Sequence, residues 1–278
     1  MRVALLLAYD GTDYRGYQRQ APHHEPTVQG VLEGVIARVA GAPVATVAAG
    51  RTDAGVHAAG QVVTFTADRP ARFMPEDWQH AINALVPHSM AVQAATAVAE
   101  DVSARYAALR RVYRYRVLCA SVRDPLRERY VHRVTAALDV NVMQAAGDCL
   151  VGTHDFAAFG HSPSNQRGQP PRHTVRDLQM VAITQADDEI WLEFAANAFL
   201  TGMVRRLVGT LLLVGTGKLT PDDVAAMLAA RQSDHPGATA PPAVVAPPQG
   251  LCLLRVDYPS GTIMWPAKEH DGDDHDHL

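Results

Sequence analysis

The sequence predicts an α+β protein made of two ferredoxin-like halves, whose antiparallel sheets meet around a central cleft. Apolar spacing produces the same order of elements twice: strand, helix, strand, strand, helix and strand, which is the ferredoxin-like order. The chain has 278 residues, of which 47% are hydrophobic and 19% charged. It is therefore long enough and apolar enough for two such halves. We expect an N-terminal half at residues 1–104, a C-terminal half at 105–264 and a tail at 265–278.

Each element of the first half follows from a local pattern. Residues 3–8 form a continuous apolar run and residues 61–66 alternate apolar and polar side chains, so both segments are expected to be strands. Apolar residues recur at helical spacing from Val28, and Thr27 stands where an N-cap is expected. The remaining elements are expected to be strands at 44–49 and 91–99 and a helix around 78–85.

The second half repeats this order and adds one helix. Helical spacing predicts helices at 139–150 and at about 202–214, and a third begins at the motif TPDD, where Thr220 and Asp223 can form a capping box. Strands are expected at 112–119, at 175–184 and 189–195 on either side of the turn QADD, and at 251–258. Segments 159–174 and 234–249 are expected to be loops, and the tail is expected to be disordered rather than metal-binding.

Basic residues are concentrated in one segment of a chain whose formal net charge is −4. Residues 105–133 contain nine arginines against Asp124 and Glu128, whereas residues 269–278 contain five acids and no Lys or Arg. A local basic stripe is typical of a phosphate-binding surface. A solvated charged face would have the same composition, so charge alone leaves both interpretations open.

Several classes of protein are excluded by the sequence. The three cysteines are too few and too widely spaced for a disulfide framework or a zinc site. Apolar runs are too short for a signal peptide or a membrane span, so we expect a cytoplasmic protein. The segment GTGK at 215–218 lacks the upstream glycine of a phosphate-binding P-loop, and the motifs HExxH, GxSxG and CxxC do not occur.

The motif GRTDAG at 50–55 occupies a glycine-rich loop between the strands expected at 44–49 and 61–66. A loop in this position can present Asp53 to a cleft, and Arg51 can keep its carboxylate ionised. An aspartate in such a loop can also hydrogen-bond to its own turn, and the loop pattern taken alone favours that interpretation. His57 is expected to be a loop or packing residue.

The segment RVYRYRV at 111–117 is expected to place tyrosines and arginines on opposite faces of a strand. Period-two geometry points Tyr113 and Tyr115 one way and Arg114 and Arg116 the other. A tyrosine in a cleft could stack on a base while the arginines lie near phosphates. RNA-recognition (RRM-like) modules use a sheet in this manner. A half-buried strand with inward aromatic residues fits the pattern equally well.

The helix expected at 202–214 is apolar on nearly all sides from Leu207 onward, so it should be buried. Arg205 and Arg206 nevertheless occupy its first turns, where a cation opposes the helix dipole. A largely buried guanidinium needs an anionic partner, and Asp53 is a candidate.

The residues alone leave two further functions open. A non-catalytic RNA-binding protein could use the same sheet and the same basic segment. A hydrolase of a small substrate could use Asp53, but it would not need the arginines at 105–133.

Several long motifs in one order resemble the TruA family of tRNA pseudouridine synthases: AYDGTDYRGYQRQ, AGRTDAGVHAAGQVV, RRVYRYRV, GTHDFAAF and ANAFLTGMVRRLVG. They extend from about residue 5 to residue 258. The resemblance implies the pseudouridine synthase fold and an isomerase that converts uridine to pseudouridine at tRNA positions 38 to 40, in the anticodon stem-loop. It also implies a homodimer with tRNA as partner, and neither a metal nor an organic cofactor.

The resemblance also implies roles for individual residues. Asp53 matches the catalytic aspartate, Tyr113 matches a tyrosine that stacks near the target base, and Arg205 matches the basic residue that pairs with the aspartate. Arg51 matches an arginine beside the catalytic site. Two positions depart from the family pattern: Tyr17 stands where members often have Trp, and Val112 interrupts a run of arginines before the tyrosine. The sequence does not decide whether Asp53 acts as a nucleophile or as a base.

Overall fold

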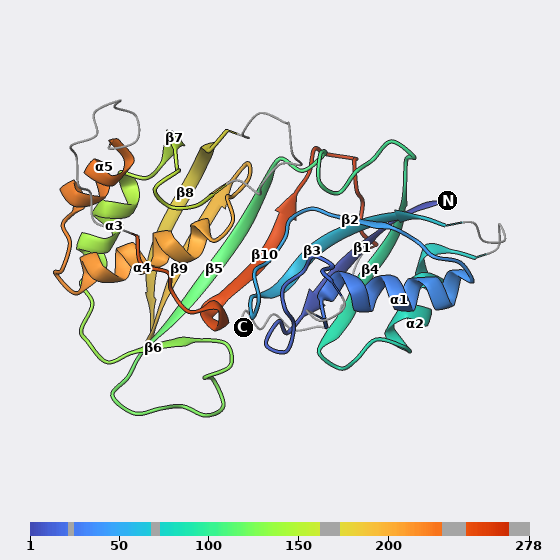
Figure 1. Ribbon diagram of the computed structural model, residues 1–278, viewed down its shortest axis with the longest axis horizontal. Coiled ribbons are helices and arrows are strands. Elements are labelled where there is room, and N and C mark those ends of the chain that lie inside the picture. Colours follow the sequence, from blue (N-terminus) through green and yellow to red (C-terminus); the bar gives the residue numbers. More distant parts are fainter. Residues whose placement is uncertain (22–24, 68–72, 162–172, 230–242, 267–278) are drawn as a thin grey trace.

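The computed structural model describes residues 1–21, 25–67, 73–161, 173–229 and 243–266. Among these residues, ten strands form one sheet (Figure 1). Its order is β4-β1-β3-β10-β5-β9-β8-β7, with β2 beside β3 and β6 beside β5. The strands are β1 (Arg2–Tyr9), β2 (Thr46–Ala48), β3 (His57–Thr66), β4 (Met90–Val98), β5 (Arg110–Cys119), β6 (His132–Val134), β7 (Gly152–Asp155), β8 (Val175–Ala186), β9 (Glu189–Ala196) and β10 (Leu251–Asp257).

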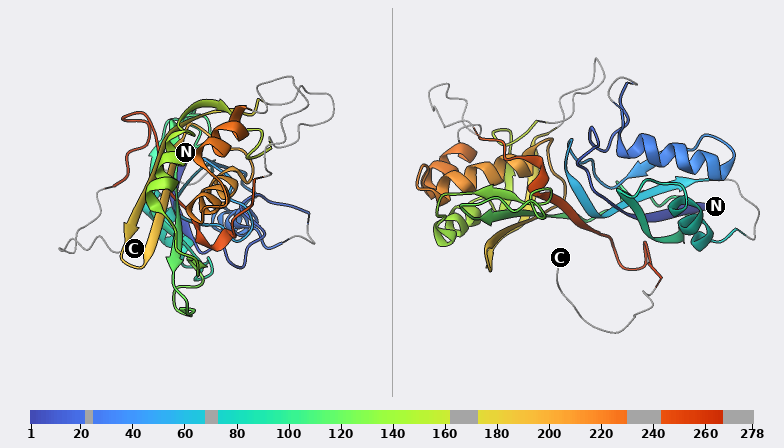
Figure 2. Two further views of the ribbon diagram at one scale, coloured as in Figure 1. Left: turned by 90° about the vertical axis from the view of Figure 1, so that its left-hand side faces the viewer. Right: turned by 90° about the horizontal axis from the view of Figure 1, so that it is seen from below.

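Helices cover one face of this sheet. They are α1 (Val28–Ala40), α2 (Pro75–Asn83), α3 (Val140–Asp148), α4 (Met203–Gly215) and α5 (Pro221–Ala229), with a short 3-10 turn at Pro248–Gly250. Figure 2 shows α1 and α4 on the same side of the sheet. Their apolar side chains share one continuous core with those of the strands, for example Leu32 of α1 with Leu5 of β1. Within the described ranges, no helix is long and apolar enough to cross a membrane.

The last strand, β10, joins the two halves. It lies between β3 and β5, pairing parallel with β3 through Cys252 and His57 and antiparallel with β5 through Leu253 and Tyr113. The predicted α+β class is confirmed, but two pairings, β10 with β3 and β6 with β5, are parallel rather than antiparallel. Because of β10, the loop that precedes β3 and the middle of β5 come together at the centre of the sheet. The division at residues 104 and 105 stays a prediction about folding units.

Local signals placed most elements correctly. Thr27 is the N-cap of α1 and accepts a hydrogen bond from Gly30 N at 3.2 Å. Thr220 and Asp223 form the expected capping box, with reciprocal bonds of 3.2 and 2.8 Å. The sequence missed the short strands β6 and β7, and β3 begins at His57, four residues earlier than expected. Pairing with neighbouring strands explains why β3 begins earlier than expected, because Ala58 pairs with both Tyr9 and Leu253.

Parts of the expected loops and tail lie outside the described residues. These are 162–172 of the loop expected at 159–174, 234–242 of the loop expected at 234–249, and 267–278 of the tail expected at 265–278. Trp265, which was assigned to the tail, is partly buried and packs in a small apolar cluster with Tyr258 and Val62.

Candidate active site

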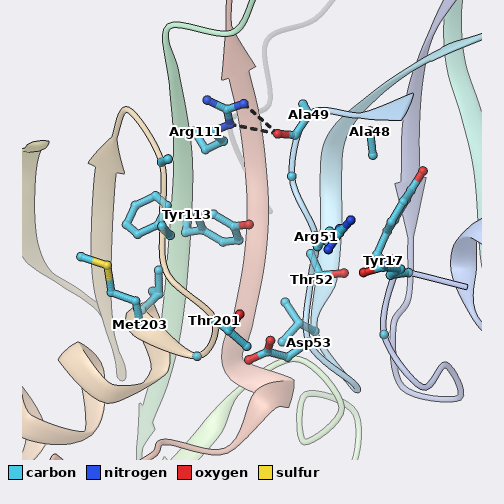
Figure 3. Close-up of a pocket in the computed structure, with 18 of the residues that line it drawn as sticks. Tyr17, Ala48, Ala49, Arg51, Thr52, Asp53, Arg111, Tyr113, Thr201 and Met203 are labelled. Atoms are coloured by element: carbon cyan, nitrogen blue, oxygen red, sulfur yellow. Dashed lines mark hydrogen bonds between the residues drawn. The ribbon is translucent and has the colours of Figure 1, made fainter. Parts of the chain in front are cut away.

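A cleft of about 700 Å³ opens where the two halves meet (Figure 3). Its walls are the loop from β2 to β3, the centre of β5, and the segment that leads into α4. Both Asp53 and Arg51 line it, together with Tyr113 and Arg205. A cleft of this volume lies within the range of ligand-binding sites in proteins.

Asp53 faces the start of α4. The Nη1 atom of Arg205 lies 3.4 Å from its Oδ2, with side chains that are 20% and 29% exposed. Arg205 is oriented by a second bond, from its Nε to the carbonyl of Ala246 at 2.8 Å. Gly202, the N-cap of α4 with φ of 68°, is so close that a Cβ there would lie 3.9 Å from the same Asp53 oxygen. The Arg205 guanidinium and the N-terminus of α4 therefore both lie close to the Asp53 carboxylate.

The loop that carries Asp53 is hydrogen-bonded to the end of β1 and to the segment that follows it. The hydroxyl groups of Tyr9 and Thr52 are hydrogen-bonded at 2.8 Å in a buried position. Tyr17 N donates to the Thr52 carbonyl at 3.0 Å. A Cβ at Gly11 would overlap the backbone carbonyl of Val56, so only glycine allows this close approach. Thr52 lines the cleft, whereas Tyr9 and Gly11 support the loop from outside it, and the sequence analysis singled out none of the three.

Tyr113 forms one wall of the cleft. It is only 6% exposed and its ring packs edge-on against Phe199, with centroids 5.2 Å apart at 87°. Its hydroxyl points toward the loop of Asp53, and Gly50 is close enough for a Cβ there to lie 3.7 Å from that oxygen. Burial raises the pKa of Tyr113, and the nearby carboxylate of Asp53 adds to this, so the phenol stays protonated at neutral pH. The tyrosine therefore presents a neutral ring and a hydrogen-bonding hydroxyl.

Arg111 fastens the two halves together beside the site. It lies two residues before Tyr113 on the same face of β5, and Figure 3 shows its bonds to the carbonyl of Ala49. Nε and Nη2 donate to that oxygen at 3.1 and 2.8 Å. Nη1 donates to Asn197 O at 2.6 Å and Nη2 to Arg105 O at 2.7 Å. Burial lowers the pKa of Arg111. Its position two residues from Tyr113 was the signal by which period-two reasoning could have found it.

The structure does not bring Arg114 and Arg116 into the cleft. They lie on the opposite face of β5, as the alternation predicts, where Arg114 bonds to Glu193 and stacks over Trp191 at 4.2 Å. Arg116 makes two bonds with Glu189, at 2.8 and 2.9 Å. The cross-strand register of β5 and β9 places Arg114 directly opposite Glu193. Substrate binding by these two arginines stays a prediction.

The basic segment 105–133 is largely neutralised by acids, most of which come from other elements. Within the described residues, six of its nine arginines pair with carboxylates: Arg110, Arg114, Arg116, Arg123, Arg127 and Arg129. Arg127 alone contacts Asp124, Asp188 and Glu189. Arg105, by contrast, lines the cleft. Arg206, on α4, does not line the cleft, and its guanidinium donates to Thr201 O at 3.4 Å.

His57 is a packing residue at the start of β3 rather than a loop residue, and it is 5% exposed. Its Nδ1 accepts from Gly11 N–H at 3.0 Å, so Nε2 carries the proton and donates to the carbonyl of Arg129 at 3.1 Å. The ring also packs against Tyr130 with centroids 5.1 Å apart. Burial lowers the pKa of His57 and outweighs the nearby carboxylate of Asp10. His57 thus ties the segment before β6 to the N-terminal half.

The cleft thus brings together a carboxylate beside an arginine, a tyrosine and further arginines at its rim, a set of side chains that suits an enzyme active site. A family model described as tRNA pseudouridine synthase matches residues 6–107 and 146–259. The chain belongs to the tRNA pseudouridine synthase family.

Individual relatives agree with this assignment. The chain is 41% identical to tRNA pseudouridine synthase A of Moorella thermoacetica, over 92% of this chain and 99% of that one. It is 40% identical to the protein of the same name from Syntrophotalea carbinolica, over 92% and 96%. For Halalkalibacterium halodurans the identity is 42%, over 86% and 88%. A solved Cbf5-Nop10-Gar1 complex aligns with a TM-score of 0.32, at 9% identity over 76% of this chain and 54% of that one, too weak a likeness to bear on the site.

Proposed function

We propose that this chain isomerises uridine to pseudouridine in tRNA, with Asp53 as the catalytic carboxylate. The observation that supports this role is the position of Asp53, which lies in the cleft with the Arg205 guanidinium 3.4 Å away. The family to which the chain belongs supports the reaction and the substrate class.

The reaction places clear demands on the cleft. The bond between N1 of uracil and C1′ of ribose breaks, the base rotates, and a new bond forms between C5 and C1′. The proton lost from C5 balances the one gained at N1, so the mass is unchanged. Because these atoms are inaccessible in a stacked helix, the nucleotide must turn out into the cleft. A carboxylate can then act either as a nucleophile or as the base that removes a proton.

We assign supporting roles to three neighbours of Asp53. Arg205 orients the carboxylate through its 3.4 Å contact. Tyr113 offers a ring on which uracil can stack and a hydroxyl that can bond to it. Arg51 is exposed at the rim and is suited to contact a phosphate or the turned-out nucleotide.

We further propose that the target lies at positions 38 to 40 of the anticodon stem-loop, and that the enzyme works in the cytoplasm as a homodimer. The motifs shared with the family support these finer statements. Arg114 and Arg116 would serve tRNA binding only if RNA also reached the helix-free face of the sheet.

The experiment is to incubate the protein with an unmodified tRNA transcript and to map pseudouridine chemically. We expect product from the native protein and none from Asp53→Asn, with tRNA affinity largely kept. Asp101→Asn, which changes an exposed aspartate between β4 and β5, is the matched control and should retain activity. Product from Asp53→Asn at the native rate would rule out the assigned role of Asp53. Absence of product from the native protein on every tRNA tried would count against the activity itself.

A further inference from the structure

Tyr106 is an aromatic residue on the rim of the cleft that the proposed chemistry does not use. It lies between β4 and β5, is 81% exposed, and lines the same cleft as Asp53 and Tyr113. A single exposed aromatic or apolar residue is common on protein surfaces and does not by itself indicate a binding site. A ring that opens into the substrate cleft of an RNA-modifying enzyme is different, because every base has a π-face on which an aromatic side chain can stack.

The backbone around Tyr106 is fixed in place. Arg111 Nη2 donates to the carbonyl of Arg105 at 2.7 Å and to that of Ala49 at 2.8 Å. Ala107 N donates to Ser103 O at 3.0 Å, and Ala104 N donates to the Thr64 hydroxyl at 3.2 Å. One buried guanidinium therefore sets the position of the Tyr106 segment relative to the loop that leads to Asp53. Because this backbone is already ordered, only the side chain of Tyr106 loses conformational entropy when it binds a ligand.

Arg105 supplies a cation beside the ring. Its guanidinium carbon lies 5.5 Å from the centroid of Tyr106, within the range of a cation–π contact. Since the tyrosine is still 81% exposed, this contact leaves most of the ring open to a ligand. An open aromatic ring next to an arginine is the combination by which proteins hold single-stranded nucleic acid, with the base stacked and the phosphate paired.

We propose that Tyr106 and Arg105 form a second nucleotide-binding platform, which holds an RNA nucleotide adjacent to the turned-out uridine. The base stacks on Tyr106 and its phosphate pairs with Arg105, while Tyr113 and Asp53 receive the uridine. The cleft of about 700 Å³ is large enough for more than the reacting base. Stacking reads no base edge, so the platform tolerates any neighbouring base. This inference rests on the proposed function and adds a second binding position to it.

The first test is a substitution series at Tyr106, assayed for pseudouridine formation on a tRNA transcript. Loss of base–aromatic stacking corresponds to a rise of roughly 5-fold or more in KM for Tyr106→Ala, with kcat much less affected because Asp53 is untouched. Tyr106→Phe should recover most of that loss, whereas Tyr106→Leu, which keeps bulk without a π-system, should recover less. Leu126→Ala is the matched control, since Leu126 is 90% exposed and lies away from the cleft.

A second measurement reports stacking directly. The anticodon stem-loop is labelled with 2-aminopurine on either side of the target and bound to Asp53→Asn protein. We expect quenching at one of the two positions, lost when Tyr106→Ala is added and kept with Tyr106→Phe. Arg105→Gln should weaken binding and lower the slope of log K against log salt by about 0.7, the value for one phosphate of a single strand.

The outcomes separate the inference from the proposed function. If the native protein makes pseudouridine and Tyr106→Ala has native KM and native quenching, the platform is wrong and the function stands. If Tyr106→Ala instead changes the sedimentation coefficient without affecting RNA binding, the ring serves contact between copies of the chain and the platform is again wrong. If the native protein makes no pseudouridine, the proposed function is wrong, and the platform, which rests on it, is wrong with it.

Discussion

Arg205 of α4 and Asp53 of the loop before β3 are 152 residues apart in the chain, yet their side chains are joined by a 3.4 Å contact across the cleft. Neither half contains both groups, so the candidate active site exists only when the halves are assembled. The pair is partly solvent-exposed, so its contribution to stability is small. Its importance lies in where it holds the carboxylate.

Arg205→Leu should lower kcat by about 10-fold or more, because the charged donor that orients Asp53 is removed. We expect a changed pH–rate profile and a nearly native melting temperature. Arg206→Leu is the matched control, as it removes the next arginine of the same helix, whose guanidinium bonds to Thr201 O instead. A native rate and pH profile for Arg205→Leu would show that the contact has no catalytic role.

Thr52→Val should disturb the loop through its buried bond with Tyr9. The hydroxyl of Tyr9 would lose its 2.8 Å partner, at a cost of about 1 kcal/mol in the free energy of unfolding. We expect Tyr9→Phe to cost a similar amount and the double variant to be non-additive, since both changes remove one bond. Urea denaturation of the native protein, the two single variants and the double variant measures the coupling energy of the two hydroxyl groups. Fully additive losses would mean that the two hydroxyl groups are not coupled.

Gly11→Ala should destabilise the protein by roughly 1–3 kcal/mol or more and reduce activity, because its Cβ would overlap the carbonyl of Val56. The backbone of the loop that carries Asp53 would have to move. Gly34→Ala provides the opposite case: nothing lies within 4 Å of a Cβ at this exposed position of α1, and alanine should stabilise the helix by about 0.5–1 kcal/mol. Chemical denaturation compares the two, and equal effects would contradict the packing argument.

Acidic pH should weaken the fold through His57. Burial places its folded pKa below the unfolded value of about 6.5. The unfolded chain therefore binds more protons as pH falls through that value, and the free energy of unfolding decreases from about pH 6.5 downward. Groups facing the ring include Asp10, Gly11 N–H, the Arg129 carbonyl, the Tyr130 ring and the backbone of Gln249.

The measurement is the change in unfolding free energy between pH 7 and pH 5, for the native protein and for His57→Asn. We expect a smaller change in the variant. Some dependence should persist, because burial also lowers the pKa of His132. An identical change in both proteins would assign the effect to other groups. Asp10, whose pKa lies at about 2, does not titrate in this range.

Local patterns in the sequence were sufficient for most of the secondary structure and for the face that each strand residue occupies. Thr27 and Thr220 cap their helices as expected, because a cap depends on a hydroxyl and a backbone N–H within one turn. Tyr113 and Arg114 lie on opposite faces of β5, because strand alternation is a property of the backbone. The motif resemblance supplied the pairing of Asp53 with Arg205, which geometry now places in one cleft.

The tertiary structure decided which side chains meet and which charges remain available. From the sequence, the arginines at 105–133 form one basic stripe. In the structure, acids that lie far away in the chain neutralise most of them, as Glu193 does for Arg114. Arg111 binds carbonyl groups of Ala49 and Asn197, which no spacing rule connects. The extension of β3 to His57 and the insertion of β10 depend on strand partners. Local patterns carry little information about contacts between distant segments, since those contacts form only when the whole chain packs.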